Sequence, residues 1–159
     1  MFQKILIATG DSSASAQVLE AGLTLAEKLG AQIMLLHVMN LLTSSFETIG
    51  NPLIGGTYPL IDNLNTQPQQ EIWQDQENIG LKRLQTYAAQ AKERHITAEI
   101  SQNLGEPGSM ICETAKNWSA DLIVVGRHQK SALSELLLGS TSNYVLHHAP
   151  CSVMAIQQL

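Results

Sequence analysis

The chain has 159 residues, of which 44% are hydrophobic and 14% charged, and this length and composition exclude a disordered protein and fit one globular domain over 1–159. The formal net charge of −5 excludes a strongly basic nucleic-acid-binding protein, so a phosphate ligand has to be held by local donors. The N-terminus lacks a signal-peptide pattern and no apolar run is long enough to span a bilayer, so we expect a cytoplasmic protein without a membrane partner.

The first 38 residues predict one βαβ unit. Residues 5–8 form a short apolar run, and the turn and N-cap residues 9–13 behind it predict the start of a helix. Apolar residues at helical spacing continue to Leu29, and Gly30 ends the helix. Residues 32–38 show almost no polar alternation, which is typical of a strand buried on both faces of a parallel sheet.

Residues 40–67 interrupt this pattern with repeated glycine and proline, and they predict a long inserted connection. Apolar residues such as Phe46, Leu53 and Tyr58 argue against a plain solvated linker. Two alternatives stay open: part of the segment packs on the surface, or it meets a partner.

The second half alternates helices and strands again. A helix is predicted over about 71–94, and the alternating residues 96–100 predict a strand near a sheet edge. Gly105-Glu106-Pro107 leads into the next helix, because proline is tolerated in a first turn. The most apolar predicted strand covers 122–125, a last helix runs from Gly139 to about His147, and a fifth strand covers 152–156.

Five strands alternating with four helices predict an α/β fold, a doubly wound and mostly parallel sheet with helices on both faces. With the first strand central, the strand order is 3-2-1-4-5, and the order reverses between strands 1 and 4. Ligands of such sheets bind beyond the carboxyl ends of the strands at this point. Residues 9–12, 126–129 and 139–142 are therefore expected to meet at one crevice.

Gly139-Ser140-Thr141-Ser142 opens the last helix. A helix N-terminus offers unpaired N–H groups and a partial positive charge, and glycine lets a phosphate approach the backbone. The local sequence alone favours a simpler alternative, in which Ser140 or Ser142 only caps the helix.

Single residues near the crevice each have two interpretations. Asp11 either binds a ribose hydroxyl or caps the first helix, and Arg127 either pairs with a phosphate or stays solvated. His128 is expected to be a surface-loop histidine, since no other ligand is spaced to complete a metal site. His37 is expected to be a core histidine with its polar atoms satisfied.

No nucleophile with an adjacent base is evident, and the chain has neither a G-x-S-x-G elbow nor a Walker-type phosphate loop. The sequence therefore makes no positive case for an enzyme. Cys112 and Cys151 have no zinc-site spacing and are expected to be reduced core residues.

Several segments resemble the universal stress protein family. They include residues 4–8, Gly105-Glu106-Pro107, the run 120–126, and residues 136–142 with 148–151. The resemblance covers the chain except for 40–67, and it implies the adenine-nucleotide alpha-hydrolase-like fold.

The ATP-binding branch of that family carries a signature of Gly, two residues, Gly, nine residues, Gly, then Ser or Thr. Gly126 and Gly139-Ser140 match it, but Gln129 replaces the second glycine. The family also places an aspartate directly after the position of Thr9, where this chain has Gly10. The first departure affects the expected phosphate contacts, and the second affects the expected contact with adenine and ribose.

The resemblance implies a stress-response protein that binds AMP or ATP, with or without Mg²⁺, and acts as a nucleotide-sensing dimer. Its dimer contact would be the last strand, around Val153, Met154 and Ala155, whose unpaired apolar edge gives a physical motive for pairing. The loops and the resemblance together give these candidate nucleotide-binding residues: Thr9, Gly10, Asp11, Val38, Gly126, Arg127, His128, Gly139, Ser140, Thr141 and Ser142. The alternatives are a non-nucleotide-binding dimeric scaffold of the same fold and a small nucleotide-dependent enzyme that would use Asp11 or His128.

Overall fold

A computed structural model describes residues 1–10, 14–40, 67–127 and 139–157 of the chain. It contains five strands and four described helices. They are β1 (Lys4–Thr9), α1 (Ala14–Leu29), β2 (Gln32–Met39), α3 (Gln67–Glu93), β3 (Ala98–Leu104), α4 (Pro107–Trp118), β4 (Leu122–Arg127), α5 (Ser140–His148) and β5 (Ser152–Gln157).

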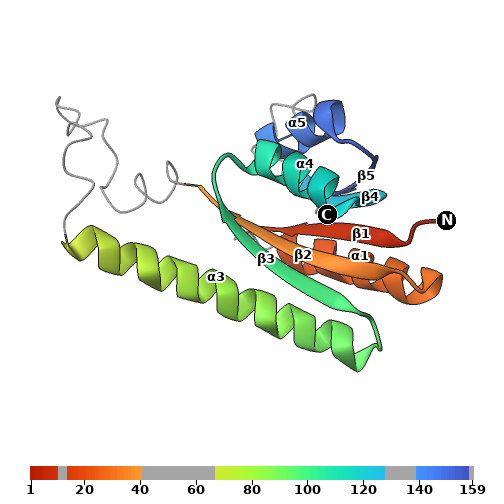
Figure 1. Cartoon of the computed structure of the whole chain (residues 1–159), viewed down its shortest axis with the longest axis horizontal. Coiled ribbons are helices and arrows are strands. Elements are labelled where there is room, and N and C mark those ends of the chain that lie inside the picture. The colour runs from red at the N-terminus through yellow and green to blue at the C-terminus, as the bar shows by residue number, and fades with distance from the viewer. Residues whose placement is uncertain (11–13, 41–66, 128–138, 158–159) are drawn as a thin grey trace.

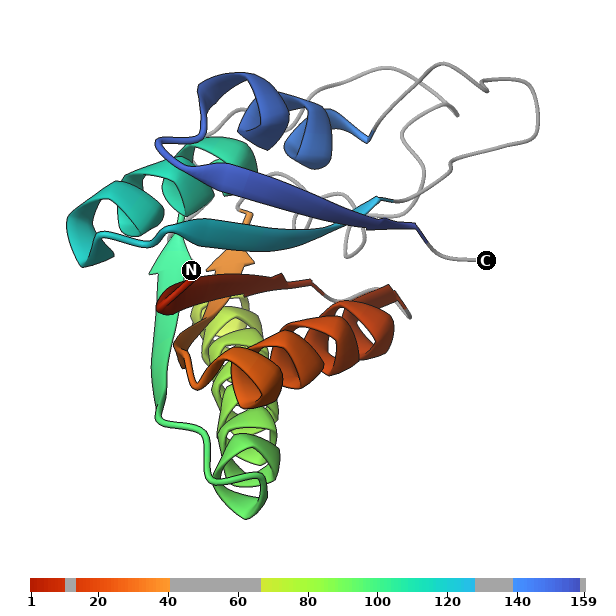
Figure 2. The same ribbon diagram turned by 90° about the vertical axis from the view of Figure 1, so that its right-hand side faces the viewer.

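The strands form one sheet in the order β3-β2-β1-β4-β5, and all four neighbouring pairs are parallel. The predicted α/β class and strand order are thus confirmed. Helices α1 and α3 cover one face of the sheet, and α4 and α5 cover the other (Figure 1 and Figure 2). Each layer between helices and sheet holds its own hydrophobic cluster.

The central strands alternate their side chains between these two clusters. Ile5 and Ile7 of β1 pack toward α1 and α3, whereas Leu6 packs toward α4 and α5, and all three are fully buried. Burial on both faces explains why these strands are nearly continuous apolar runs. No described helix is long and apolar enough to cross a membrane.

The predicted strand over 96–100 is wrong at its start, because Ile96 belongs to the turn that ends α3. His95 has φ of 59°, its N–H donates to the Lys92 carbonyl, and the Ile96 N–H donates to the Ala91 carbonyl at 2.9 Å. These bonds form a Schellman motif, in which the residue after the left-handed one makes an apolar contact. Ile96 is accordingly buried.

Two further boundaries differ from the prediction. Helix α3 begins at Gln67 instead of Glu71. Strand β4 continues beyond Val125 through Gly126 and Arg127, which pair with Ile156 and Gln157 of β5. The sequence pattern places Gly126 after this strand, but pairing with β5 extends the strand through it.

Candidate functional site

The sheet divides at its carboxyl edge between β1 and β4. These strands pair only over Ile5–Ile7 of β1 against Leu122–Val124 of β4. Beyond them, Thr9 pairs with His37 of β2, and Gly126 pairs with Ile156 of β5. The ends of β1 and β4 therefore turn to opposite neighbours, as expected at the switch point of a doubly wound sheet.

The residues that end β1 are held firmly. Thr9 is buried and its Oγ1 donates to the Leu36 carbonyl at 3.2 Å. The Gly10 N–H donates to Ser15 Oγ at 3.0 Å, and the same hydroxyl donates to the Gly10 carbonyl at 2.6 Å. The loop after β1 is thereby attached to the first turn of α1.

Helix α5 begins at the same edge of the sheet, because it runs from there back toward the end of the sheet where β5 starts (Figure 2). Its N-cap is Gly139, and no side-chain hydrogen bond caps this end. Ser142 Oγ donates to the Gly139 carbonyl at 3.0 Å. The capping role predicted for Ser140 or Ser142 is therefore wrong, since the N-cap position is occupied by a glycine.

The first intrahelical bond of α5 joins the Asn143 N–H to the Gly139 carbonyl at 2.9 Å. The N–H groups before Asn143 have no such partner within the helix, and they carry its positive dipole end. Within the described residues, the hydroxyls of Ser140 and Thr141 have no hydrogen-bond partner either. This end of α5 can bind an anion.

Arg127 adds a full positive charge at the end of β4. Its Nε is buried, and among the described residues it has no hydrogen-bond partner. A buried guanidinium N–H without a partner is unfavourable by roughly 1–3 kcal/mol or more. The residue therefore has an unused donor at the strand end that precedes α5.

Val38 lies one position beyond the Thr9–His37 pair and is half-buried, so β2 contributes backbone to this edge. His37 is buried, as predicted, and its Nδ1 lies 3.4 Å from Gln102 Oε1. Two predicted site residues, Asp11 and His128, lie outside the described residues, and so does Gln129.

Sequence reasoning missed two residues at this site, Ser15 and Arg83. Arg83 of α3 donates from Nη1 to the Gly10 carbonyl at 3.1 Å, across 73 positions of the chain. Ser15 could have been noticed, because serine in a first helical turn commonly bonds the preceding loop. Arg83 carries no local signal, since its partner is a main-chain carbonyl of a distant loop.

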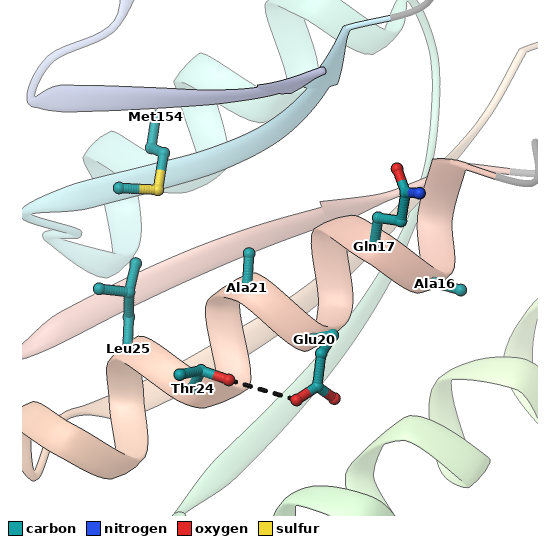
Figure 3. Close-up of a pocket in the computed structure, with 7 residues that line it drawn as sticks. All are labelled: Ala16, Gln17, Glu20, Ala21, Thr24, Leu25 and Met154. Atoms are coloured by element: carbon teal, nitrogen blue, oxygen red, sulfur yellow. Dashed lines mark hydrogen bonds between the residues drawn. The ribbon is translucent and has the colours of Figure 1, made fainter. Parts of the chain in front are cut away.

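A shallow pocket of about 580 Å³ lies elsewhere, between the outer face of α1 and β5. Figure 3 shows Met154 of β5 reaching toward Leu25 across it, with Ala21 on the next turn of α1. Among its polar residues, Glu20 is bonded to Thr24 and Arg94. The pocket contains none of the candidate nucleotide-binding residues, and its apolar lining offers no chemistry.

Other reactive groups are not gathered into a site. In the part of the chain that the structure describes, no three His, Cys, Asp or Glu residues are placed to hold a metal ion. Cys112 and Cys151 are free thiols packed against the cluster beneath α4 and α5. Burial raises the pKa of both thiols, which makes them poor nucleophiles and fits their predicted core role.

Comparison with known proteins gives consistent matches. A family model described as the universal stress protein family matches residues 1–157. Universal stress protein Sll1388 of Synechocystis is 31% identical, with 98% of each chain covered. Universal stress protein YxiE of Bacillus subtilis is 33% identical, covering 99% of this chain and 100% of its own.

Solved structures share the fold at lower identity. The structure of the protein MJ0577 has a TM-score of 0.77 at 19% identity, covering 100% of this chain and 98% of the other. An Arabidopsis thaliana universal stress protein family structure with AMP bound has a TM-score of 0.61 at 19% identity, covering 99% and 92%. A universal stress protein in complex with cAMP gives 0.63 at 18% identity, covering 99% and 98%.

Proposed function

Because the chain belongs to the universal stress protein family, we propose that it is a stress-response protein that binds AMP or ATP at the edge where β1 and β4 separate. The observation that carries the proposal is the uncapped N-terminus of α5 at the same edge of the sheet as the unused Arg127 donor. Two structures of the same fold, one with AMP and one with cAMP, support the choice of an adenine nucleotide.

Each part of the nucleotide has a candidate partner. The phosphates would meet the N–H groups and hydroxyls of residues 139–142, with Gly126 giving room for close approach. The base and ribose would lie near the backbone of Val38 and of Thr9 and Gly10. Arg127 would neutralise phosphate charge, and Asp11 and His128 are assigned to the ribose and phosphates.

AMP is the better candidate where phosphate contacts are few. Gln129 replaces a glycine of the ATP-binding signature, so this position of the signature carries a side chain. The described residues hold no cluster of metal ligands, so Mg²⁺ would be bound chiefly by the phosphates of ATP, which is its common mode in proteins.

Calorimetric titration with ATP, ADP, AMP and adenosine tests the proposal. We expect binding of at least one nucleotide. Arg127→Gln should weaken the binding of phosphorylated ligands about tenfold and leave the affinity for adenosine unchanged. Arg94→Gln is the matched control, because it removes the same charge from an exposed pair with Glu20. No binding of any nucleotide by the wild type at millimolar concentration would refute the proposal.

The second candidate is a dimeric scaffold of the same fold that binds no nucleotide. Gln129 and the Gly10-Asp11 order favour it. Replacing Gln129 by glycine separates the two: ATP binding by Gln129→Gly alone would establish the scaffold, whereas binding by both proteins would support a nucleotide sensor.

We include in the proposal a homodimer through β5 and a cytoplasmic, non-enzymatic role. Strand β5 is at the edge of the sheet, and Ala155 is exposed on it. The apolar pocket beside it, with Met154 on its wall, lies next to this edge. An edge strand with apolar neighbours favours pairing with a second chain.

A further inference from the structure

Helix α3 is attached to the main chain of the loop that follows β1. Arg83 Nη1 donates to the Gly10 carbonyl at 3.1 Å, and Ser15 Oγ donates to the same oxygen. Two helices, α1 and α3, therefore fix the orientation of one peptide group at the candidate site. A charged donor to a carbonyl is among the stronger hydrogen bonds.

Gly80 brings α3 close enough for this contact. A Cβ at Gly80 would lie 2.6 Å from His37 Nδ1 and 2.6 Å from Gln102 Oε1, well inside van der Waals contact. Residues three apart lie on the same face of a helix, so Gly80 and Arg83 belong to one docking surface. His37 is in turn the strand partner of Thr9.

Gln102 of β3 also contacts both α3 and His37. Its Nε2 donates to the Glu77 carbonyl of α3 at 3.0 Å, while its Oε1 lies 3.4 Å from His37 Nδ1. Figure 1 shows α3 running along β3 and β2 on this face of the sheet. The segment of α3 from Glu77 to Arg83 thus contacts the ends of β1, β2 and β3 together.

The geometry points to Arg83 as a positioning residue of the loop that follows β1. It also points to α3 as a helix whose contact with this loop responds to nucleotide binding. This inference rests on the proposed function. A ligand that orders the Thr9–Gly10 backbone favours the state in which Arg83 is docked, and the docked state favours the ligand by the same factor. The site and the outer surface of α3 are thereby coupled.

Hydrogen exchange of the full chain without ligand tests whether Arg83 positions the loop that follows β1. Arg83→Gln should speed exchange several-fold in peptides covering 8–15, because Gly10 loses one of its two tethers. Arg94→Gln is the control, since Arg94, directly after α3, joins that end of the helix to Glu20 of α1 at 2.7 Å, away from the loop. Equal exchange of 8–15 in the wild type and Arg83→Gln would overturn the inference.

The coupling between nucleotide binding and the docking of α3 is measured with AMP and ATP. In the wild type, nucleotide should slow exchange over 77–87, and Arg83→Gln should raise the dissociation constant roughly five- to tenfold and abolish that protection. Arg83→Lys, which keeps a charged donor, should restore part of both effects, and Arg94→Gln should match the wild type.

The outcomes are distinguishable. Wild-type binding with unchanged affinity and unchanged α3 protection in Arg83→Gln overturns the coupling and leaves the proposed function standing. Failure of the wild type to bind any nucleotide overturns the proposed function and the coupling with it. In that case the ligand-free exchange still decides whether Arg83 holds the loop.

Discussion

Gly108 of α4 lies directly against Tyr144 of α5, so that a Cβ at Gly108 would stand 2.8 Å from the Cβ of Tyr144. The Tyr144 Cβ is fixed to its backbone and cannot rotate away. Helix α5, whose N-terminus faces the candidate site, therefore owes its position partly to a missing side chain on α4.

Replacing Gly108 by alanine should lower the free energy of unfolding by about 1–3 kcal/mol, because the two helices have to separate. Urea denaturation measures the change. Ser109→Ala is the control, since Ser109 is exposed and its N–H, like that of Gly108, bonds the capping Glu106 side chain. Equal stability of Gly108→Ala and the wild type would show that the helices can adjust.

Gly10→Asp should be tolerated, although glycines in ligand loops are often essential. The nearest atom to a Cβ at Gly10 is Ser15 Oγ at 3.9 Å, which is ordinary contact, and its φ lies outside the left-handed region. An aspartate near the N-terminus of α1 is favoured by the helix dipole, by about 0.3–1 kcal/mol. Thermal unfolding should show no loss of stability.

The same change restores the aspartate that the family usually carries after the position of Thr9. We therefore expect tighter binding of adenosine and AMP, with Gly10→Asn as the uncharged control of similar shape. A loss of both stability and affinity in Gly10→Asp would mean that this loop needs glycine for another reason.

The proposed dimer predicts that Ala155→Arg gives a folded monomer. Ala155 is exposed on the edge strand β5, so an arginine there should disturb a partner and not the core. Leu104→Arg is the matched control on the opposite edge strand, β3, where Leu104 is 49% exposed. Sedimentation of the three proteins decides between a β5 dimer, a β3 dimer and a monomer.

Glu20 predicts a small dependence of stability on pH. Its hydrogen bonds with Arg94 lower the pKa of its carboxyl in the folded chain. A lowered pKa stabilises the fold above the unfolded value of about 4.3, and this contribution is lost as the pH falls through the folded value. Both side chains are partly exposed, so the effect should be small and screened by salt.

Thermal unfolding of the wild type and Glu20→Gln at pH 6 and pH 3 measures this contribution. The wild type should be the more stable at pH 6 in low salt, and the difference should shrink at pH 3. An unchanged difference would assign the effect to the packing of Glu20 and not to its charge.

Much of the fold is predictable because strands buried on both faces leave apolar runs that are hard to mistake. Residues 5–8, 32–38 and 122–125 all lie within strands of the structure. The start of β3 is misplaced by the sequence pattern because Ile96, although buried, serves the end of a helix. Burial alone does not distinguish these two roles.

The candidate site is predictable only where residues follow strand ends. The order of the strands brings the β1 loop and α5 to one edge, so Thr9 and Gly139 can be placed there from the sequence. The contact of Arg83 with Gly10 and that of Gly108 with Tyr144 depend on how helices pack. The spacing of apolar residues in the sequence does not predict such contacts between helices and loops.

The short pairing of β1 with β4, over Ile5–Ile7 only, also bears on how the molecule comes apart. It makes a narrow seam between two half-sheets, β3-β2-β1 and β4-β5, each paired over at least six residues per strand pair. A nucleotide lodged across that seam would touch both halves, and its binding free energy would add directly to their cohesion. Such a ligand would hold the two half-sheets together and so stabilise the fold, in addition to any signalling role.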